Sequence, residues 1–242
     1  MDNWAHYLDT FLFAIVPYVA AFAFVLGAIF RYVVRPYSVS SLSSQFLENR
    51  QHFWALVPFH YAIIILLGGH VIGFLVPRHV LAWNNHPVRL YVLEVTALIF
   101  GLLALFGLLS AIVRRLANRR VRVVTTFSDW VLLLLLLGQV GAGVYVAVFH
   151  PWGSSWFAAT AVPYLRSLVT FDPDIRYVVE LPFMAKLHVL NAFVLLGVTP
   201  FTRLIHMWVA PFPYLWRRPQ VVRWYRRRQA AAVPPSAKGA DR

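Results

Sequence analysis

The stretch HYAIIILLGGHVIGFLV, residues 60–76, holds two histidines, His60 and His70, in an otherwise apolar run. With the residues that precede it, this run is long enough for a helix to cross a bilayer, which takes about 20 residues. An imidazole in hydrocarbon is costly, so a histidine in such a helix indicates a functional site. The stretch therefore predicts a membrane helix that carries two functional side chains.

A second apolar run, near the C-terminus, also holds two histidines, His188 and His206. Two histidine pairs on two separate helices suggest two metal centres stacked across a membrane. The alternative is that each imidazole is a buried core residue bonded to a backbone carbonyl.

The composition supports a membrane protein. Of 242 residues, 60% are hydrophobic and 13% charged, whereas a soluble domain has about 45–50% and roughly 25%. Lipid admits only helices and closed barrels, and the apolar runs lack the alternation of strands, so we expect an all-α protein. The expected bundle has five transmembrane helices, at residues 10–32, 53–76, 88–113, 128–149 and 182–208. Pro17, Pro58 and Pro200 lie inside these helices or near their ends and are expected to kink them.

The absence of cysteine excludes thiolate-held iron–sulfur clusters and covalently attached haem. The formal charge of +13 is explained by cations that flank the spans, so nucleic acid is not an expected partner.

The charges between the spans predict the orientation. Five arginines and no acid lie within residues 114–122, and the tail is also rich in arginine, whereas the first ten residues carry two aspartates and no base. The positive-inside rule therefore places the N-terminus outside and the C-terminus in the cytoplasm, as in a multi-pass protein of the inner (cytoplasmic) membrane. Residues 1–225 form the transmembrane domain, residues 226–242 a basic disordered tail, and residues 152–178 an amphipathic segment at the outer interface.

In this orientation, the depth of each histidine pairs His60 with His206 at the inner side and His70 with His188 at the outer side. Two facing histidines are suitable axial ligands for haem b. The spacing along the two helices differs, because ten residues separate His60 from His70 and eighteen separate His188 from His206. On straight helices these separations are about 15 Å and about 27 Å. Tilt of the fifth helix and a kink at Pro200 must absorb this difference.

Haem propionates require cationic partners at the membrane boundary. Arg203 lies one helical turn before His206, and Arg115 ends the third span on the same side, so both are predicted partners of the inner haem. Lys186, two residues before His188, is predicted to serve the outer haem. Arginines at span ends can alternatively be topology anchors only.

Ordered motifs along nearly the whole chain carry a family resemblance: P-Y-V-A at 17–20, S-S-Q-F-L at 43–47, F-H-Y-A-I at 59–63, G-G-H-V-I-G at 68–73, R-V-R-V-V-T-T-F-S-D at 120–129, S-L-V-T-F-D at 167–172, K-L-H-V-L at 186–190 and P-F-T-R-L-I-H-M-W at 200–208. With these motifs the chain resembles the gamma subunit of respiratory nitrate reductase, a diheme cytochrome b membrane anchor.

The resemblance implies two b haems held by His60, His70, His188 and His206, and oxidation of a quinol, menaquinol or ubiquinol, beside the outer haem. Electrons would pass to a cytoplasmic iron–sulfur (beta) subunit and a molybdenum catalytic (alpha) subunit. The quinol site of the family corresponds to Gly69 and His70 plus a lysine, for which the nearest match here is Arg89, a departure from the pattern.

Two other functions stay open from the sequence. One is a diheme anchor of another quinone-linked reductase, of the sulfur-compound or heterodisulfide type. The other is a haem-free transporter, for which the spans contain few acidic residues. The basic loop and tail could dock a cytoplasmic partner or bind anionic lipids.

Overall fold

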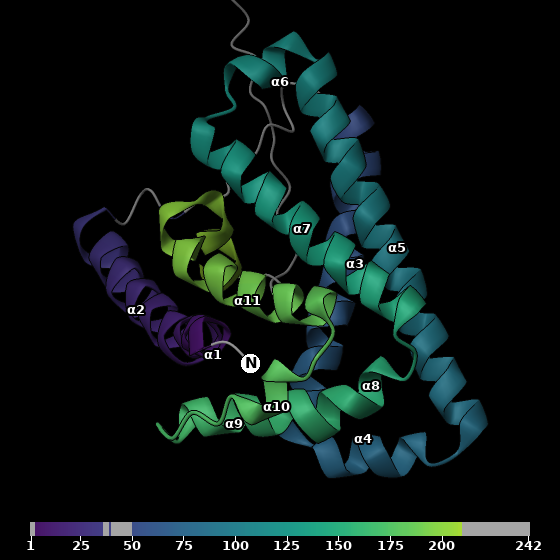
Figure 1. Cartoon of the computed structure of the whole chain (residues 1–242). Coiled ribbons are helices and arrows are strands. Elements are labelled where there is room, and N and C mark those ends of the chain that lie inside the picture. Colours follow the sequence, from purple (N-terminus) through teal and green to yellow (C-terminus); the bar gives the residue numbers. More distant parts are fainter. Residues whose placement is uncertain (1–2, 36–38, 40–49, 210–242) are drawn as a thin grey trace, which may run out of the picture. The chain divides into compact units, whose positions relative to one another are not determined.

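The protein is described from a computed structural model, which covers residues 3–35, 39 and 50–209 (Figure 1). The predicted disordered tail at 226–242 lies outside these residues. Within them the secondary structure is helical and contains no strand, which confirms the predicted all-α class.

Among the described residues, five helical stretches are long and apolar enough to cross a membrane, as predicted: Trp4–Val34, Phe53–Leu75, Pro87–Ala117, Phe127–Phe149 and Phe183–Phe201. The first combines α1 (Asn3–Thr10), a π-helical turn η1 (Phe11–Ile15) and α2 (Val16–Val34). The others are built on α3 (Arg50–Leu75), α5 (Pro87–Ala117), α7 (Phe127–Phe149) and α11 (Phe183–Val198). The chain is therefore a multi-pass membrane protein.

The loop between the second and third spans differs from the prediction, because it begins with a helix-starting proline. The loop expected between the second and third spans contains a short helix, α4 (Pro77–Asn84). Both α4 and α5 begin with a proline, whose missing N–H costs nothing in a first turn, where no partner exists.

The three prolines expected to kink their spans behave differently. Pro17 lies in the first turn of α2, after the π-helical turn and Val16, and α3 continues through Pro58 as an uninterrupted helix. At Pro200 the α-helix has already ended, and two 3-10 turns, η4 (Thr199–Phe201) and η5 (Arg203–Val209), follow it. The expected helix 182–208 was therefore wrong in its last part, where His206 lies on a 3-10 turn.

The helices pack in the order α3, α5, α7, α11, α2. A core of Ala62, Ala104, Leu108, Leu133 and Val140 joins α3, α5 and α7. Gly107 lets α5 approach α3 closely, because a Cβ placed there would lie 2.6 Å from the carbonyl oxygen of Ala55. The two helices that carry three of the four histidines therefore do not pack mainly against each other: α3 packs mainly against α5, and α11 packs mainly against α2 and α7.

The segment predicted at 152–178 contains the short helices α8 (Gly153–Trp156), α9 (Val162–Val169) and α10 (Arg176–Val179), and a π-helical turn, η3 (Phe157–Ala161), joins the first two. In Figure 1 these helices and α4 lie at one end of the spans, and α6 (Arg119–Val123) lies at the other. The Tyr164 hydroxyl donates a 2.7 Å hydrogen bond to the Phe13 carbonyl, which attaches α9 to the first span.

Candidate functional site

The structure brings the four histidines together as two pairs. The rings of His60 on α3 and His206 on η5 are 6.2 Å apart between centroids, with 59° between their planes. The rings of His70 on α3 and His188 on α11 are also 6.2 Å apart, with 35° between their planes. The pairs are those expected from the depth of each residue.

In each of the four histidines, the Nδ1 atom lies within hydrogen-bond distance of a backbone carbonyl oxygen. These contacts are His60 to Leu56 at 2.7 Å, His70 to Leu66 at 2.8 Å, His188 to Gln139 at 2.9 Å and His206 to Arg203 at 2.6 Å. A carbonyl only accepts, so each Nδ1 carries the proton, and in a neutral imidazole the Nε2 atom then keeps its lone pair. This arrangement leaves Nε2 as the metal-binding atom of each histidine, although in this structure the Nε2 of His188 is contacted by the Gln139 side-chain amide at 3.2 Å.

The donor set fits haem. No group of three or more His, Cys, Asp or Glu residues that could hold a metal occurs in the described part of the chain, so each pair offers two donors. A metal with only two protein ligands must bring its remaining ligands with it, as iron does in a porphyrin. If one metal ion lay between two imidazoles, the distance between the ring centres would be about 6 Å, since each metal–nitrogen bond is about 2 Å and each nitrogen lies roughly 1 Å from its ring centre. The ring centres are 6.2 Å apart in both pairs.

Glycines leave space beside the His70–His188 pair. A Cβ placed on Gly68 or Gly69, which precede His70 on α3, would have no neighbour within 4 Å. A Cβ on Gly143 would lie 3.0 Å from Cε1 of His188. The α3 surface next to His70 therefore has room for a flat macrocycle, whereas Gly143 on α7 packs closely against the His188 ring.

Charged groups gather near His206. Arg203, on the same turn, forms a 2.7 Å ion pair with Asp129, whose carboxylate is buried at the start of α7. Asp129 also completes a capping box with Thr126. Arg115 lies close enough to interact electrostatically with Asp129, Arg114 and Arg203, and its buried Nε has no hydrogen-bond partner in the part of the chain that the structure describes. Among the described residues, Arg115 and Arg203 thus both interact with the Asp129 carboxylate.

The other predicted site residues are more dispersed. Lys186 lies 3.8 Å from the carboxylate of Asp9 and so links α11 to the first span. Gly69 adjoins His70 on α3. Arg89 lies in the first turn of α5, where its guanidinium is 5.3 Å from the ring centre of Trp83.

Sequence reasoning missed the residues that surround His188 and His70. On α7, Gln139 contacts both ring nitrogens of His188, through its carbonyl and through its side-chain amide at 3.2 Å. The Asn191 amide donates to the Gln139 side-chain oxygen at 2.9 Å, which turns the Gln139 NH₂ group toward His188. Phe157 packs edge-on against His70 at 5.3 Å. The polar residues Gln139 and Asn191 inside apolar spans were the available signal.

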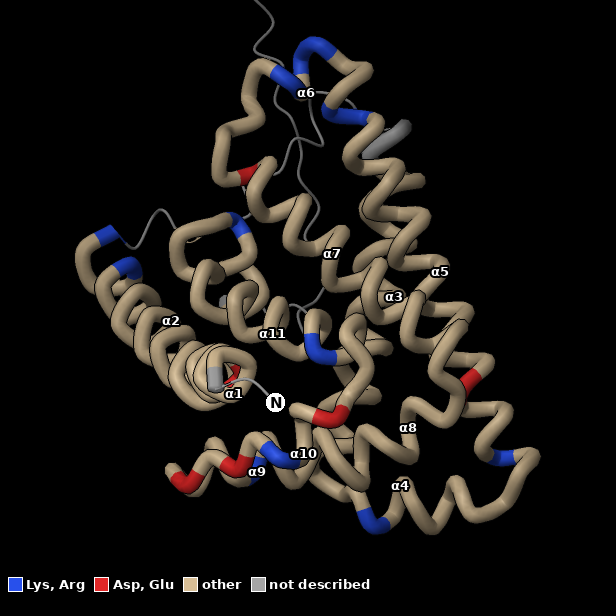
Figure 2. The backbone as a smooth tube through the Cα atoms, viewed as in Figure 1, with Lys and Arg blue, Asp and Glu red and all other residues tan. Residues whose placement is uncertain are grey.

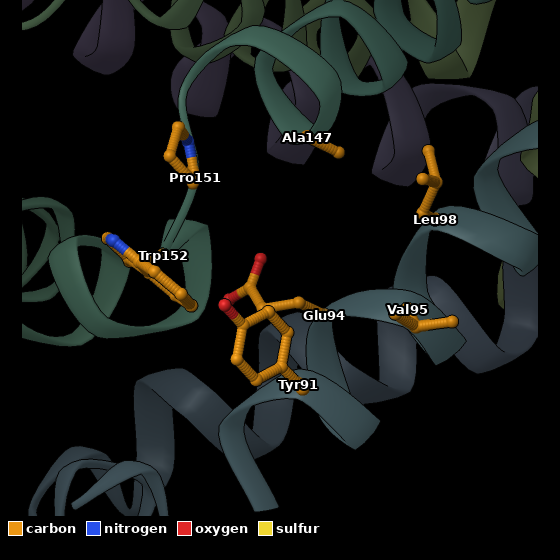
Figure 3. A pocket seen from close by; sticks show the side chains of 7 residues that line it. All are labelled: Tyr91, Glu94, Val95, Leu98, Ala147, Pro151 and Trp152. Carbon is orange, nitrogen blue, oxygen red and sulfur yellow. The ribbon is translucent and has the colours of Figure 1, made fainter. Parts of the chain in front are cut away.

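A hollow of about 260 Å³ opens between α5, the end of α7 and α8, lined in part by Tyr91, Glu94 and Trp152 (Figure 3). The Glu94 carboxylate in this hollow already has a structural role, because it accepts hydrogen bonds from the backbone N–H and the hydroxyl of Ser154 at 2.9 and 2.5 Å. These bonds fasten α8 to α5.

Comparison with known proteins matches residues 9–225 to the family described as nitrate reductase gamma subunit. The chain is 35% identical to the respiratory nitrate reductase 2 gamma chain of Escherichia coli (strain K12) over 224 residues, 90% of this chain and 97% of that protein. It is 33% identical to the nitrate reductase gamma chain of Bacillus subtilis (strain 168) over 210 residues, covering 85% and 94% of the two chains. It is also 33% identical to the respiratory nitrate reductase 1 gamma chain of Escherichia coli (strain K12), in a match that covers 90% of this chain and 98% of that protein.

Proposed function

The chain belongs to the nitrate reductase gamma subunit family, and on that premise we propose that it is the membrane cytochrome b subunit of a respiratory nitrate reductase. The observation that carries the proposal is the pair of facing imidazoles, repeated at two places between α3 and the fifth span. Two b haems fit these pairs, the inner one between His60 and His206 and the outer one between His70 and His188. When bound, each haem supplies an iron that accepts and releases one electron.

The quinol, menaquinol or ubiquinol, reaches the outer pair laterally from the bilayer. The absence of a side chain at Gly69 leaves open space next to His70, where the quinol ring can lie. A guanidinium has only donors and no acceptor, so at this site Arg89 would stabilise negative charge on the quinol oxygen rather than accept its proton. Oxidation of one quinol releases two electrons and two protons, and the protons leave on the outer side.

Basic residues hold the propionates. Arg115 and Arg203 both interact with Asp129 near His206, and the Arg115 Nε has no hydrogen-bond partner among the described residues, which supports these two arginines as ligands of the inner haem's carboxylates. Lys186 is the corresponding residue for the outer haem, where its 3.8 Å pair with Asp9 is long enough to leave donors for a second anion.

The subunit lies in the inner (cytoplasmic) membrane with its C-terminus inside, and electrons pass inward to an iron–sulfur (beta) subunit and then to the molybdenum (alpha) subunit that reduces nitrate. Each electron that crosses does about 2.3 kcal/mol of electrical work per 100 mV, so the reaction generates membrane potential without pumping protons. The basic residues of α6 would dock the partner or bind anionic lipids.

A diheme anchor of another quinone-linked reductase would need the same histidine pairs. The match to relatives named as nitrate reductase gamma chains, over more than nine-tenths of their length, favours nitrate reductase.

The test is the haem content and activity of a His70→Ala variant in the assembled complex. We expect reduced-minus-oxidised spectra of the wild type to show two b-type components, and the variant to lose one of them together with quinol-dependent nitrate reduction. His79→Ala is the matched control, because His79 is an exposed histidine on α4. Retention of both components and of quinol oxidation in His70→Ala would overturn the proposal.

A further inference from the structure

The backbone that presents His206 is not α-helical. Two 3-10 turns flank Thr202, whose extended conformation (φ −122°, ψ 177°) changes the direction of the chain. The buried hydroxyls of Thr199 and Thr202 donate to the carbonyls of Leu195 and Thr199, at 2.7 and 3.2 Å. Irregular backbone at membrane depth requires such protein partners, because lipid supplies none.

Arg31 satisfies two more carbonyls of this break. Its Nη1 atom donates to the carbonyl oxygens of Pro200 at 2.6 Å and Thr202 at 2.9 Å, on the two sides of Phe201. A guanidinium is planar and permanently charged, so it holds both acceptors in a fixed relation.

Arg31 belongs to a continuous face of α2. Ala20, Phe24, Gly27 and Arg31 are spaced by four, three and four residues and therefore share one side of the helix. Each contacts the end of the fifth span, which lies beside α2 in Figure 1. A Cβ on Gly197 would lie 3.2 Å from Cα of Ala20, the Phe24 and Trp208 rings are 4.9 Å apart, and a Cβ on Gly27 would lie 2.8 Å from Cβ of Pro200.

We propose that Arg31 is a positioning residue for His206. It fixes the path of residues 200–202, with Gly27 allowing the close approach, so that the 3-10 turn directs the His206 ring toward His60 at 6.2 Å. This path resolves the unequal spacing of the histidines, ten residues on α3 and eighteen on the fifth span. The inference depends on the proposed haem between His60 and His206.

The test measures each haem separately, by electron paramagnetic resonance and redox titration of membranes that contain the assembled complex. Arg31→Met removes the donors and keeps an unbranched apolar stem, Arg31→Lys retains a donor without the planar fork, and Gly27→Ala displaces Pro200 with Arg31 in place. Arg78→Met removes an exposed cation of α4 and serves as the control.

We expect Arg31→Met and Gly27→Ala to shift the signal and potential of the His60–His206 haem, or to lower its occupancy by at least half, while the His70–His188 haem is unchanged. Arg31→Lys should restore part of the signal, and Arg78→Met should match the wild type. Unchanged spectra and potentials in Arg31→Met, or an equal loss of both haems in Gly27→Ala and Arg31→Lys, would overturn the inference. If Arg31→Met does not accumulate in the membrane, the other two variants decide. A wild type without haem would instead refute the proposed function.

Discussion

At the scale of single residues, the four histidines share one design. Each is held by a hydrogen bond from Nδ1 to a carbonyl, three of them on the residue's own helical turn and the fourth, from His188, on α7. Backbone carbonyls are fixed by the helix, so the rings are oriented before any cofactor arrives. Preorganisation of this kind lowers the entropy lost when a ligand binds.

The space beside the His188 ring gives a first prediction. Gly143→Ala should push the ring from its position, because the new Cβ would lie 3.0 Å from Cε1. We expect lower occupancy of the His70–His188 site, measured as haem bound per protein, with the His60–His206 component retained.

Gly141 on the same helix is the matched control, since a Cβ there has no neighbour within 4 Å. Alanine is favoured over glycine in a helix by about 1 kcal/mol, so neither variant should lose helix stability. Equal haem content in the two variants would contradict the prediction.

The order of the histidines along two oppositely directed spans was enough to predict which of them pair, but the unequal spacing of ten and eighteen residues did not show how they reach the same depth. The partners of these residues could not be predicted in the same way. Asp129 and Arg203 are 74 residues apart in the sequence, and their 2.7 Å ion pair depends on how α7 and η5 approach each other. The contact of Gln139 with His188 depends in the same way on the packing of α7 against α11.

At the scale of elements, a π-helical turn in the first span is coupled to the interfacial helices. The η1 turn includes Phe13, whose carbonyl accepts the hydrogen bond from the fully buried Tyr164 hydroxyl. Burial raises the pKa of Tyr164 above its ordinary value of 10.0. The phenol therefore remains a donor at neutral pH.

Tyr164→Phe should destabilise the protein by about 1–3 kcal/mol, because the buried Phe13 carbonyl loses its donor. Since the folded-state pKa is raised, the stabilisation is fully present below the unfolded-state pKa near 10 and is lost as pH rises through the folded-state value. Denaturant unfolding in detergent should show a difference between wild type and variant that is constant from pH 7 to 9 and shrinks at higher pH.

The conservative change Tyr7→Phe is the control, since Tyr7 is 64% exposed. A pH-independent difference for Tyr164→Phe, or one as small as that of Tyr7→Phe, would contradict the assignment.

Apolar runs predicted all five spans, because length and hydropathy suffice in a solvent that cannot bond the backbone. They could not predict where a span stops being α-helical. Pro200 predicted a kink here, whereas the 3-10 turn at Thr199–Phe201 and its hydrogen bonds from Arg31 depend on how α2 packs against the fifth span. Tertiary contacts thus decide the local structure there.

At the scale of the whole spanning unit, charge differs between its two ends. Figure 2 shows basic residues gathered at α6, whereas acidic residues lie near the end of α9 at the opposite end. Positive charge is retained on the cytoplasmic side during insertion, so this asymmetry supports a cytoplasmic α6 and an external α8–α10 segment.

The chain has no cysteine, so a single introduced thiol reports the side of the membrane on which it lies. We expect Glu180→Cys, at an exposed position before α11, to react with a membrane-impermeant maleimide in intact spheroplasts. Arg120→Cys, at an exposed position on α6, should react only after permeabilisation. Expression of this subunit alone prevents a partner from covering α6, and labelling of both variants in denaturing detergent confirms that each thiol is reactive. Labelling of Arg120→Cys but not Glu180→Cys in intact spheroplasts would reverse the orientation, and with it the direction of the proposed electron transfer.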